Sequence, residues 1–144
     1  MNYKIINIEE QKFLGKSCGR VNTETDFSIF WMKFYEKNKN YDGITYGVSS
    51  DFMDDEFTYM ICVPLTEEDR VKDFQPIVVD AATYVIFELV GPVNEAIPSA
   101  WGFAMKNFDL AESPNLEVYY SGNRMDVNYK MELWIPIKNK SLYI

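Results

Sequence analysis

Apolar residues follow two periods along this chain, one typical of strands and one typical of a helix. Residues 3–21 predict a β-hairpin, because apolar positions flank a polar turn. Thr23 and Asp26 then resemble a capping box at the start of a helix. The apolar face of this helix would carry side chains at helical spacing, namely Phe27, Phe30, Trp31, Phe34 and Tyr35. Two strands complete this half, at 44–50 and 57–64.

The second half repeats this order of elements. Gly91-Pro92 precedes the expected second helix, and Asn94 is its expected cap. Strands are expected before and after this helix, at 76–80, 83–90, 116–121 and 129–137. When the two halves are aligned at an offset of 72 or 73 residues, several identical residues coincide, among them Pro64 and Pro136. Such coincidences within matching element orders argue for an internal duplication.

The duplication predicts an α+β fold built as a single domain over residues 1–144. Two βαββ modules, approximately 1–65 and 74–144, would merge into one mostly antiparallel sheet. Both helices would cover one face of that sheet. A central ligand cleft is expected between the halves, near their pseudo-twofold axis.

Composition excludes several classes of function. The chain has no histidine and only two cysteines, so we expect no metal site, no cofactor and no His-dependent nucleophile. A net charge of −8 repels the phosphate backbone of nucleic acids. No apolar run approaches the roughly 18 residues of a membrane span, and the start lacks the order of a secretory signal. Free thiols in the cytoplasm are therefore expected.

Glu132 departs from the duplicated pattern. It falls on the apolar Met60 of the first half, in the middle of the closing strand. Strand alternation places Trp134 on the same face. If that face lines the cleft, Glu132 is a partly buried anion. A cationic ligand lying over the aromatic rings would then compensate its charge and complete the site. The alternative is that Glu132 faces solvent on an open sheet face and that the aromatic residues belong to the core.

The closing strand Glu132-Leu133-Trp134-Ile135-Pro136-Ile137, the segment Tyr46-Gly47-Val48-Ser49 and Trp101 together resemble the GyrI-like small-molecule-binding domains. This module also forms the effector-binding half of some AraC-type and MerR-type multidrug-responsive transcription regulators. The resemblance covers essentially the whole chain. It implies that Glu132 is the anionic anchor of an aromatic pocket for lipophilic, often cationic, aromatic compounds. Trp134 would lie beside this anchor and Trp101 would form a wall, with further lining from Tyr46, Tyr84 and Tyr119.

The resemblance leaves three functions open. The first is a binding module that senses or sequesters drug-like cations. The second is a hydrolase of strained cyclopropane-containing natural products, in which Glu132 would be the catalytic residue that activates water. The third is a protein-interaction role, with a regulator or DNA gyrase as the partner. Regulators of this family carry a helix-turn-helix domain before the module. Here the module begins near Met1, so we expect no direct DNA binding by this chain.

Overall fold

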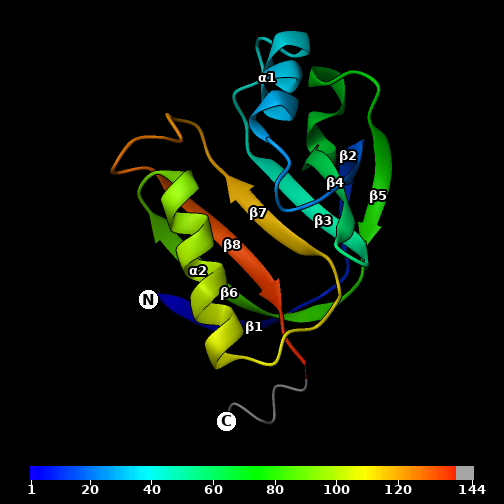
Figure 1. Ribbon diagram of the computed structural model, residues 1–144. Coiled ribbons are helices and arrows are strands. Elements are labelled where there is room, and N and C mark those ends of the chain that lie inside the picture. The colour runs from blue at the N-terminus through cyan, green and yellow to red at the C-terminus, as the bar shows by residue number, and fades with distance from the viewer. Residues whose placement is uncertain (139–144) are drawn as a thin grey trace.

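The computed structural model describes residues 1–138, which form an α+β fold of eight strands and two α-helices (Figure 1). The expected second module extends to residue 144, so its last residues lie outside this range. The first half consists of β1 (Tyr3–Ile8), β2 (Gln11–Val21), α1 (Ser28–Lys37), β3 (Thr45–Met53) and β4 (Glu56–Pro64). A short 3-10 helix, η1 (Leu65–Arg70), leads to the second half. That half consists of β5 (Gln75–Val79), β6 (Ala82–Val90), α2 (Val93–Asn107), β7 (Asn115–Tyr119) and β8 (Lys130–Pro136).

The strands form one antiparallel sheet in the order β1-β6-β8-β7-β3-β4-β2-β5. This order is symmetric about the central pair, β7 and β3, because each strand of one half has its counterpart at the mirrored position. A pseudo-twofold axis therefore passes between β3 and β7. The first strand of each half is exchanged, since β1 pairs with β6 and β5 pairs with β2.

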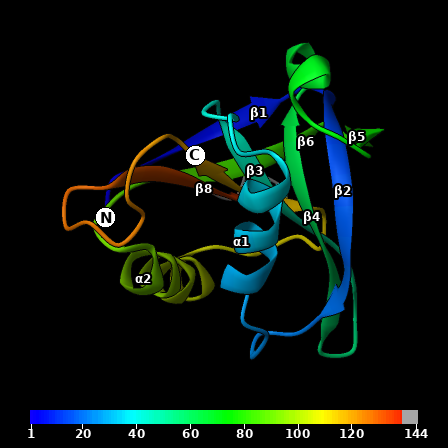
Figure 2. The same cartoon turned by 90° about the horizontal axis from the view of Figure 1, so that it is seen from above.

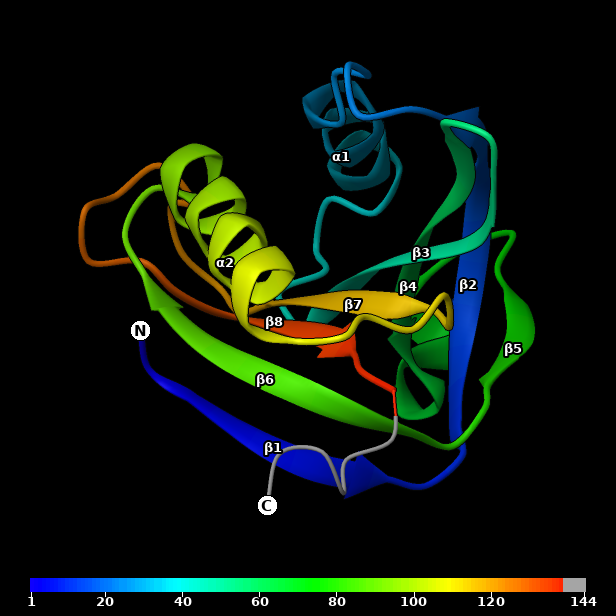
Figure 3. The same ribbon diagram turned by 60° about the horizontal axis from the view of Figure 1, so that its bottom comes forward.

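The hairpin predicted over residues 3–21 is wrong. β1 and β2 do not pair with each other, although only Glu9 and Glu10 separate them; β2 pairs with β4 and β5. The sheet curves so strongly that the end of β1 meets the start of β2 at a corner (Figure 3). A short polar link shows that the chain changes direction, but it does not specify the partner of either strand.

Both helices begin differently from the sequence prediction. The N-cap of α1 is Phe27, which forms no side-chain cap, and Asp26 instead accepts hydrogen bonds from the backbone and hydroxyl of Ser28. Thr23 is therefore not the start of this helix. The N-cap of α2 is Pro92 rather than Asn94. Packing against the sheet, more than capping, fixes where each helix begins.

Both helices cover the same face of the sheet, as the sequence predicts (Figure 2). On this helix-covered face, Trp31 and Phe34 of α1 and Ala104 of α2 share one buried cluster with strand residues such as Phe87 and Leu133. The opposite face has a smaller cluster, formed by Phe13, Val48, Cys62, Val79, Tyr84, Ile86 and Leu116. Neither helix in residues 1–138 has the length and apolar character needed to cross a bilayer.

Candidate ligand-binding site

The predicted site residues lie on both faces of the sheet. Glu132 and Trp134 point away from the helices, and Tyr46 and Tyr84 belong to the cluster on that same face. Tyr119 and Trp101 belong to the helix-covered face instead. The structure therefore brings four of the six predicted residues to one face and separates the other two from them.

Glu132 is half-buried, and its Oε1 accepts a hydrogen bond of 2.8 Å from the indole Nε1 of Trp134. Its neighbours across the sheet are Val118 on β7 and Glu88 on β6. The Tyr84 ring packs against Trp134 with 5.7 Å between ring centroids. Glu132 is thus an anion on the uncovered face, already satisfied in part by the indole beside it.

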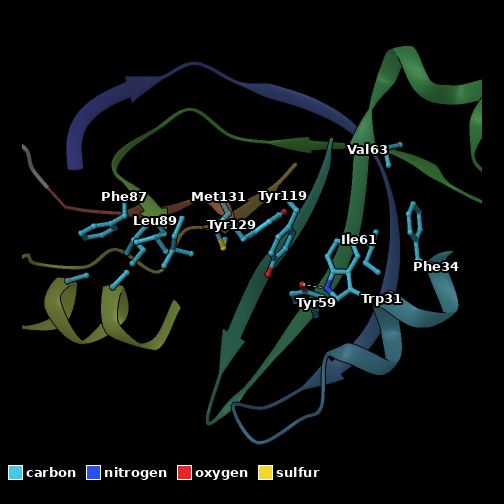
Figure 4. Close-up of a cluster of buried hydrophobic side chains, with 14 of the residues drawn as sticks. Trp31, Phe34, Tyr59, Ile61, Val63, Phe87, Leu89, Tyr119, Tyr129 and Met131 are labelled. Atoms are coloured by element: carbon cyan, nitrogen blue, oxygen red, sulfur yellow. Dashed lines mark hydrogen bonds between the residues drawn. The ribbon is translucent and has the colours of Figure 1, made fainter. Parts of the chain in front are cut away.

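A second carboxylate, Glu117, lies on the helix-covered face at the centre of the sheet. It is on β7, directly opposite Gly47 of β3, and is partly buried. Its Oε1 accepts hydrogen bonds from the hydroxyls of Tyr59, at 2.8 Å, and Tyr119, at 2.9 Å. Tyr59 in turn accepts a hydrogen bond of 3.1 Å from the indole of Trp31 (Figure 4). Side chains from both halves of the chain therefore converge on one carboxylate at the pseudo-twofold axis.

Burial raises the pKa of the Glu117 carboxyl, while the two tyrosine donors and the positive charge of Arg124 act in the opposite direction. Burial also holds the pKa values of Tyr59 and Tyr119 well above their ordinary value, and the Glu117 charge adds to that effect. Both hydroxyls therefore stay protonated at neutral pH and donate to the carboxylate. A carboxylate held in this way is preorganised for a charged partner.

Gly47 makes room for this arrangement. A Cβ at this position would lie 2.6 Å from Glu117 Oε1 and would overlap the hydroxyl of Tyr59. Real Cβ atoms essentially never approach so closely, so any larger residue would displace the carboxylate or the phenol. The glycine on β3 is therefore a structural requirement for the hydrogen bond between Tyr59 and Glu117.

Arg124 places a positive charge over the same group of aromatic rings. Its guanidinium carbon lies 3.8 Å from the ring centroid of Tyr119 and 4.2 Å from that of Trp31. The guanidinium also donates hydrogen bonds to the Tyr35 hydroxyl, at 3.1 Å, and to Thr45 Oγ1, at 3.2 Å. Arg124 comes from the loop between β7 and β8. The molecule thus holds a cation of its own against two aromatic faces near a partly buried carboxylate.

Sequence reasoning missed Glu117, Tyr59, Gly47 and Arg124 as site residues. One feature of the sequence could have indicated this site. Strand alternation places Glu117 and Tyr119 on one face and Leu116 and Val118 on the other. Which face the helices cover is not encoded in that alternation. Within the described residues, no group of three thiol or carboxylate side chains is placed to hold a metal ion.

The sequence matches the GyrI-like family, described as a small molecule binding domain, over residues 1–138. No curated protein sequence matches it significantly. Among solved structures, it is similar to a protein of Staphylococcus aureus MU50 described as a bacterial transcription regulation protein. The two are 21% identical with a TM-score of 0.75, covering 96% of this chain and 99% of the other.

Two further solved structures share the fold. SAV2435 bound to tetraphenylphosphonium is 20% identical with a TM-score of 0.75, covering 99% of this chain and 98% of that one. A hydrolase of Listeria innocua is 15% identical with a TM-score of 0.52, covering 94% and 91%. At these identities the likeness establishes the fold, and the fold class expected from the sequence is confirmed.

Proposed function

Because this chain belongs to the GyrI-like small-molecule-binding domains, we propose that it binds lipophilic, cationic aromatic molecules beside Glu117. The observation that carries the proposal is the position of Arg124, whose guanidinium lies over Tyr119 and Trp31. A site that accommodates this side-chain cation has the aromatic surfaces and the charge that a ligand cation needs. This site would serve to sense or to sequester such a molecule.

The energetics favour a cation at this position. An uncompensated, partly buried carboxylate is costly, and an opposite charge nearby removes part of that cost. A cation over an aromatic face gains about 0.5–2 kcal/mol, depending on how far it is desolvated. Tetraphenylphosphonium, the ligand of the similar SAV2435 structure, is a lipophilic cation with aromatic rings. That likeness supports the proposal but does not locate the ligand in this chain.

Glu132 is a second carboxylate beside aromatic rings. A binding experiment must therefore distinguish a ligand at Glu117 from a ligand at Glu132. Tetraphenylphosphonium is titrated into the protein by isothermal calorimetry, and Glu117→Gln is compared with Glu132→Gln. We expect Glu117→Gln to weaken binding by at least about tenfold, since it removes one member of a charge pair at a partly buried site. Glu132→Gln should change the affinity less than about twofold. Glutamine keeps an acceptor for the tyrosine hydroxyls, so the comparison isolates the charge.

The opposite result would place the ligand on the uncovered face. If Glu132→Gln abolishes binding and Glu117→Gln does not, the anchor is Glu132, with Trp134, Tyr46 and Tyr84 as its aromatic neighbours. If neither variant changes the affinity, a charge role for either carboxylate is wrong. Circular dichroism spectra of both variants show whether the fold is retained.

Hydrolysis is the second candidate function, and the raised pKa of Glu117 favours it. A carboxylate with a raised pKa is a better general base near neutral pH than an ordinary glutamate. Glu117 would take a proton from water as the water oxygen attacks a ring carbon of a strained cyclopropane, and the opened ring would take up a proton in return. Chromatography of such a compound after incubation measures turnover, which Glu117→Gln should abolish. The similarity of the fold to that of the Listeria innocua hydrolase is the reason for this test.

We propose that the chain works in the cytoplasm. Cys18 and Cys62 are free thiols, in keeping with a reducing cytoplasm. A role in multidrug-responsive regulation would require a protein partner, either a regulator or a gyrase. Co-purification of a tagged chain with a topoisomerase subunit would support the gyrase alternative.

A further inference from the structure

A hollow of about 260 Å³ lies on the other side of α1 from the residues that surround Glu117. It is bounded by α1, by the middle of β2 and by the segment that leads into β5. Apolar side chains contribute much of its lining, namely Phe30, Phe34, Ile61 and Phe74. It shares no lining residue with the group formed by Trp31, Tyr59, Glu117, Tyr119 and Arg124. The hollow is therefore a separate feature of the fold.

Four lysines also line this hollow, namely Lys16, Lys33, Lys37 and Lys72, and no acidic residue lines it. Among residues 1–138, none of the four forms an ion pair. Lys33, Lys37 and Lys72 are exposed, and Lys16 is partly buried. The chain as a whole has 22 acidic and 14 basic residues, so the local charge has the opposite sign to the net charge. Four unpaired ammonium groups around an apolar hollow attract an anion with an apolar body.

Cys18 provides a chemical marker inside the hollow. It is a free, partly exposed thiol that lines the hollow, and burial raises its pKa to about 11. Cys62, the other cysteine, is fully buried, and its pKa is raised to about 12 by burial. Of the two, only Cys18 is accessible to a thiol reagent. Occupation of the hollow should therefore be visible as protection of one thiol.

We propose that this hollow is a binding site for a small amphipathic anion, with its apolar part against the three phenylalanines and its carboxylate, sulfonate or phosphate at the lysine rim. The volume is slightly below the roughly 300–1,000 Å³ of drug-sized pockets, which favours a ligand with one or two rings. The site would have the opposite charge preference to the one proposed at Glu117. One chain would then carry a cation site and an anion site on either side of α1.

The test uses 1-anilinonaphthalene-8-sulfonate, a fluorescent amphipathic anion, with the full chain. Lys33→Gln/Lys72→Gln removes two rim charges. Its matched control is Lys106→Gln/Lys130→Gln, which changes the net charge equally at two exposed lysines outside the hollow. We expect the rim variant to weaken binding by about tenfold, since each partly exposed charge contributes modestly. The control should stay within about twofold of the parent, and neither variant should change the binding of the neutral analogue N-phenyl-1-naphthylamine.

The location is tested through Cys18. Saturating sulfonate should slow maleimide labelling of Cys18 severalfold, and Cys18→Ser should abolish labelling altogether. Glu117→Gln should leave sulfonate binding unchanged, so failure of the cation site and failure of this site give different results. Equal weakening in both double variants would show a general charge effect and overturn the proposal. Tight binding without protection of Cys18 would place the anion elsewhere and overturn it as well.

Discussion

Replacing Gly47 with alanine is expected to damage the Glu117 site, although Gly47 itself has no side chain that a ligand could contact. The new Cβ would lie 2.6 Å from Glu117 Oε1 and overlap the Tyr59 hydroxyl. The carboxylate and the phenol would have to separate, which breaks the 2.8 Å hydrogen bond between them. Tyr59 is buried and its hydroxyl also accepts the hydrogen bond from Trp31, so a shift of the phenol would disturb that bond as well.

Two costs set the magnitude. Forcing an extra carbon into packed surroundings costs about 1–3 kcal/mol. Losing a hydrogen bond to a charged group costs about 1.5–3 kcal/mol. Together they predict a decrease in the free energy of unfolding of about 2.5–6 kcal/mol, which for a domain of this size lowers Tm by about 8–20 °C.

Thermal unfolding followed by circular dichroism measures the effect, and Gly102→Ala is the control. Gly102 lies within α2, and a Cβ there would meet no atom within 4 Å. Alanine is the better helix former, so this variant should be more stable than the parent by up to about 1 kcal/mol. The change from glycine to alanine is thus expected to lower the free energy of unfolding at Gly47 and to raise it at Gly102.

A double-mutant cycle identifies the cause. Tyr59→Phe removes the hydroxyl that the new Cβ would overlap, so Gly47→Ala should cost at least about 1 kcal/mol less in that background. A parent-like Tm for Gly47→Ala would refute the steric reasoning. An unchanged cost in the Tyr59→Phe background would show that the clash is not with this hydroxyl.

Three further predictions concern the charges of the site. Glu117→Gln should stabilise the protein at pH 7: the folded-state pKa of Glu117 is raised, so stability falls as pH rises through it. This gain, read from urea unfolding, should vanish below about pH 4, where the carboxyl is protonated in both states. Tetraphenylphosphonium affinity measured calorimetrically should fall as pH drops through that same pKa, because the protonated carboxyl is neutral. Arg124→Gln should tighten tetraphenylphosphonium binding severalfold, because the guanidinium competes for the same rings; weaker binding would mean that Arg124 supports the pocket.

Much of the fold could be predicted from periodicity. The aromatic residues at helical spacing mark α1, and the repeated order of elements predicts one sheet with both helices on one face. The partners of the edge strands could not be predicted, because β1 and β5 each pair within the opposite half. Pairing over such distances depends on the tertiary fold and leaves no local signal.

The site was harder to predict than the fold. Glu132 differs from the apolar residue at the matching position of the first half, whereas Glu117 lies in a strand whose other residues are all buried. Only the position of the helices distinguishes the two faces. The spacing of Trp31 predicts a place on the apolar face of the helix, and the side chain is buried there, but its indole also donates a hydrogen bond to Tyr59. A single aromatic side chain therefore has a packing role and a polar role at once.

The facing pair Gly47 and Glu117 limits how many cations the central site can hold. The backbone is nearly symmetric about this point, yet the acid needs the absence of a side chain across from it. Two carboxylates could not occupy the axis together, since each would fill the space that the other requires. Although the fold is duplicated, only one carboxylate fits at its axis. We therefore expect one cation to bind there per polypeptide.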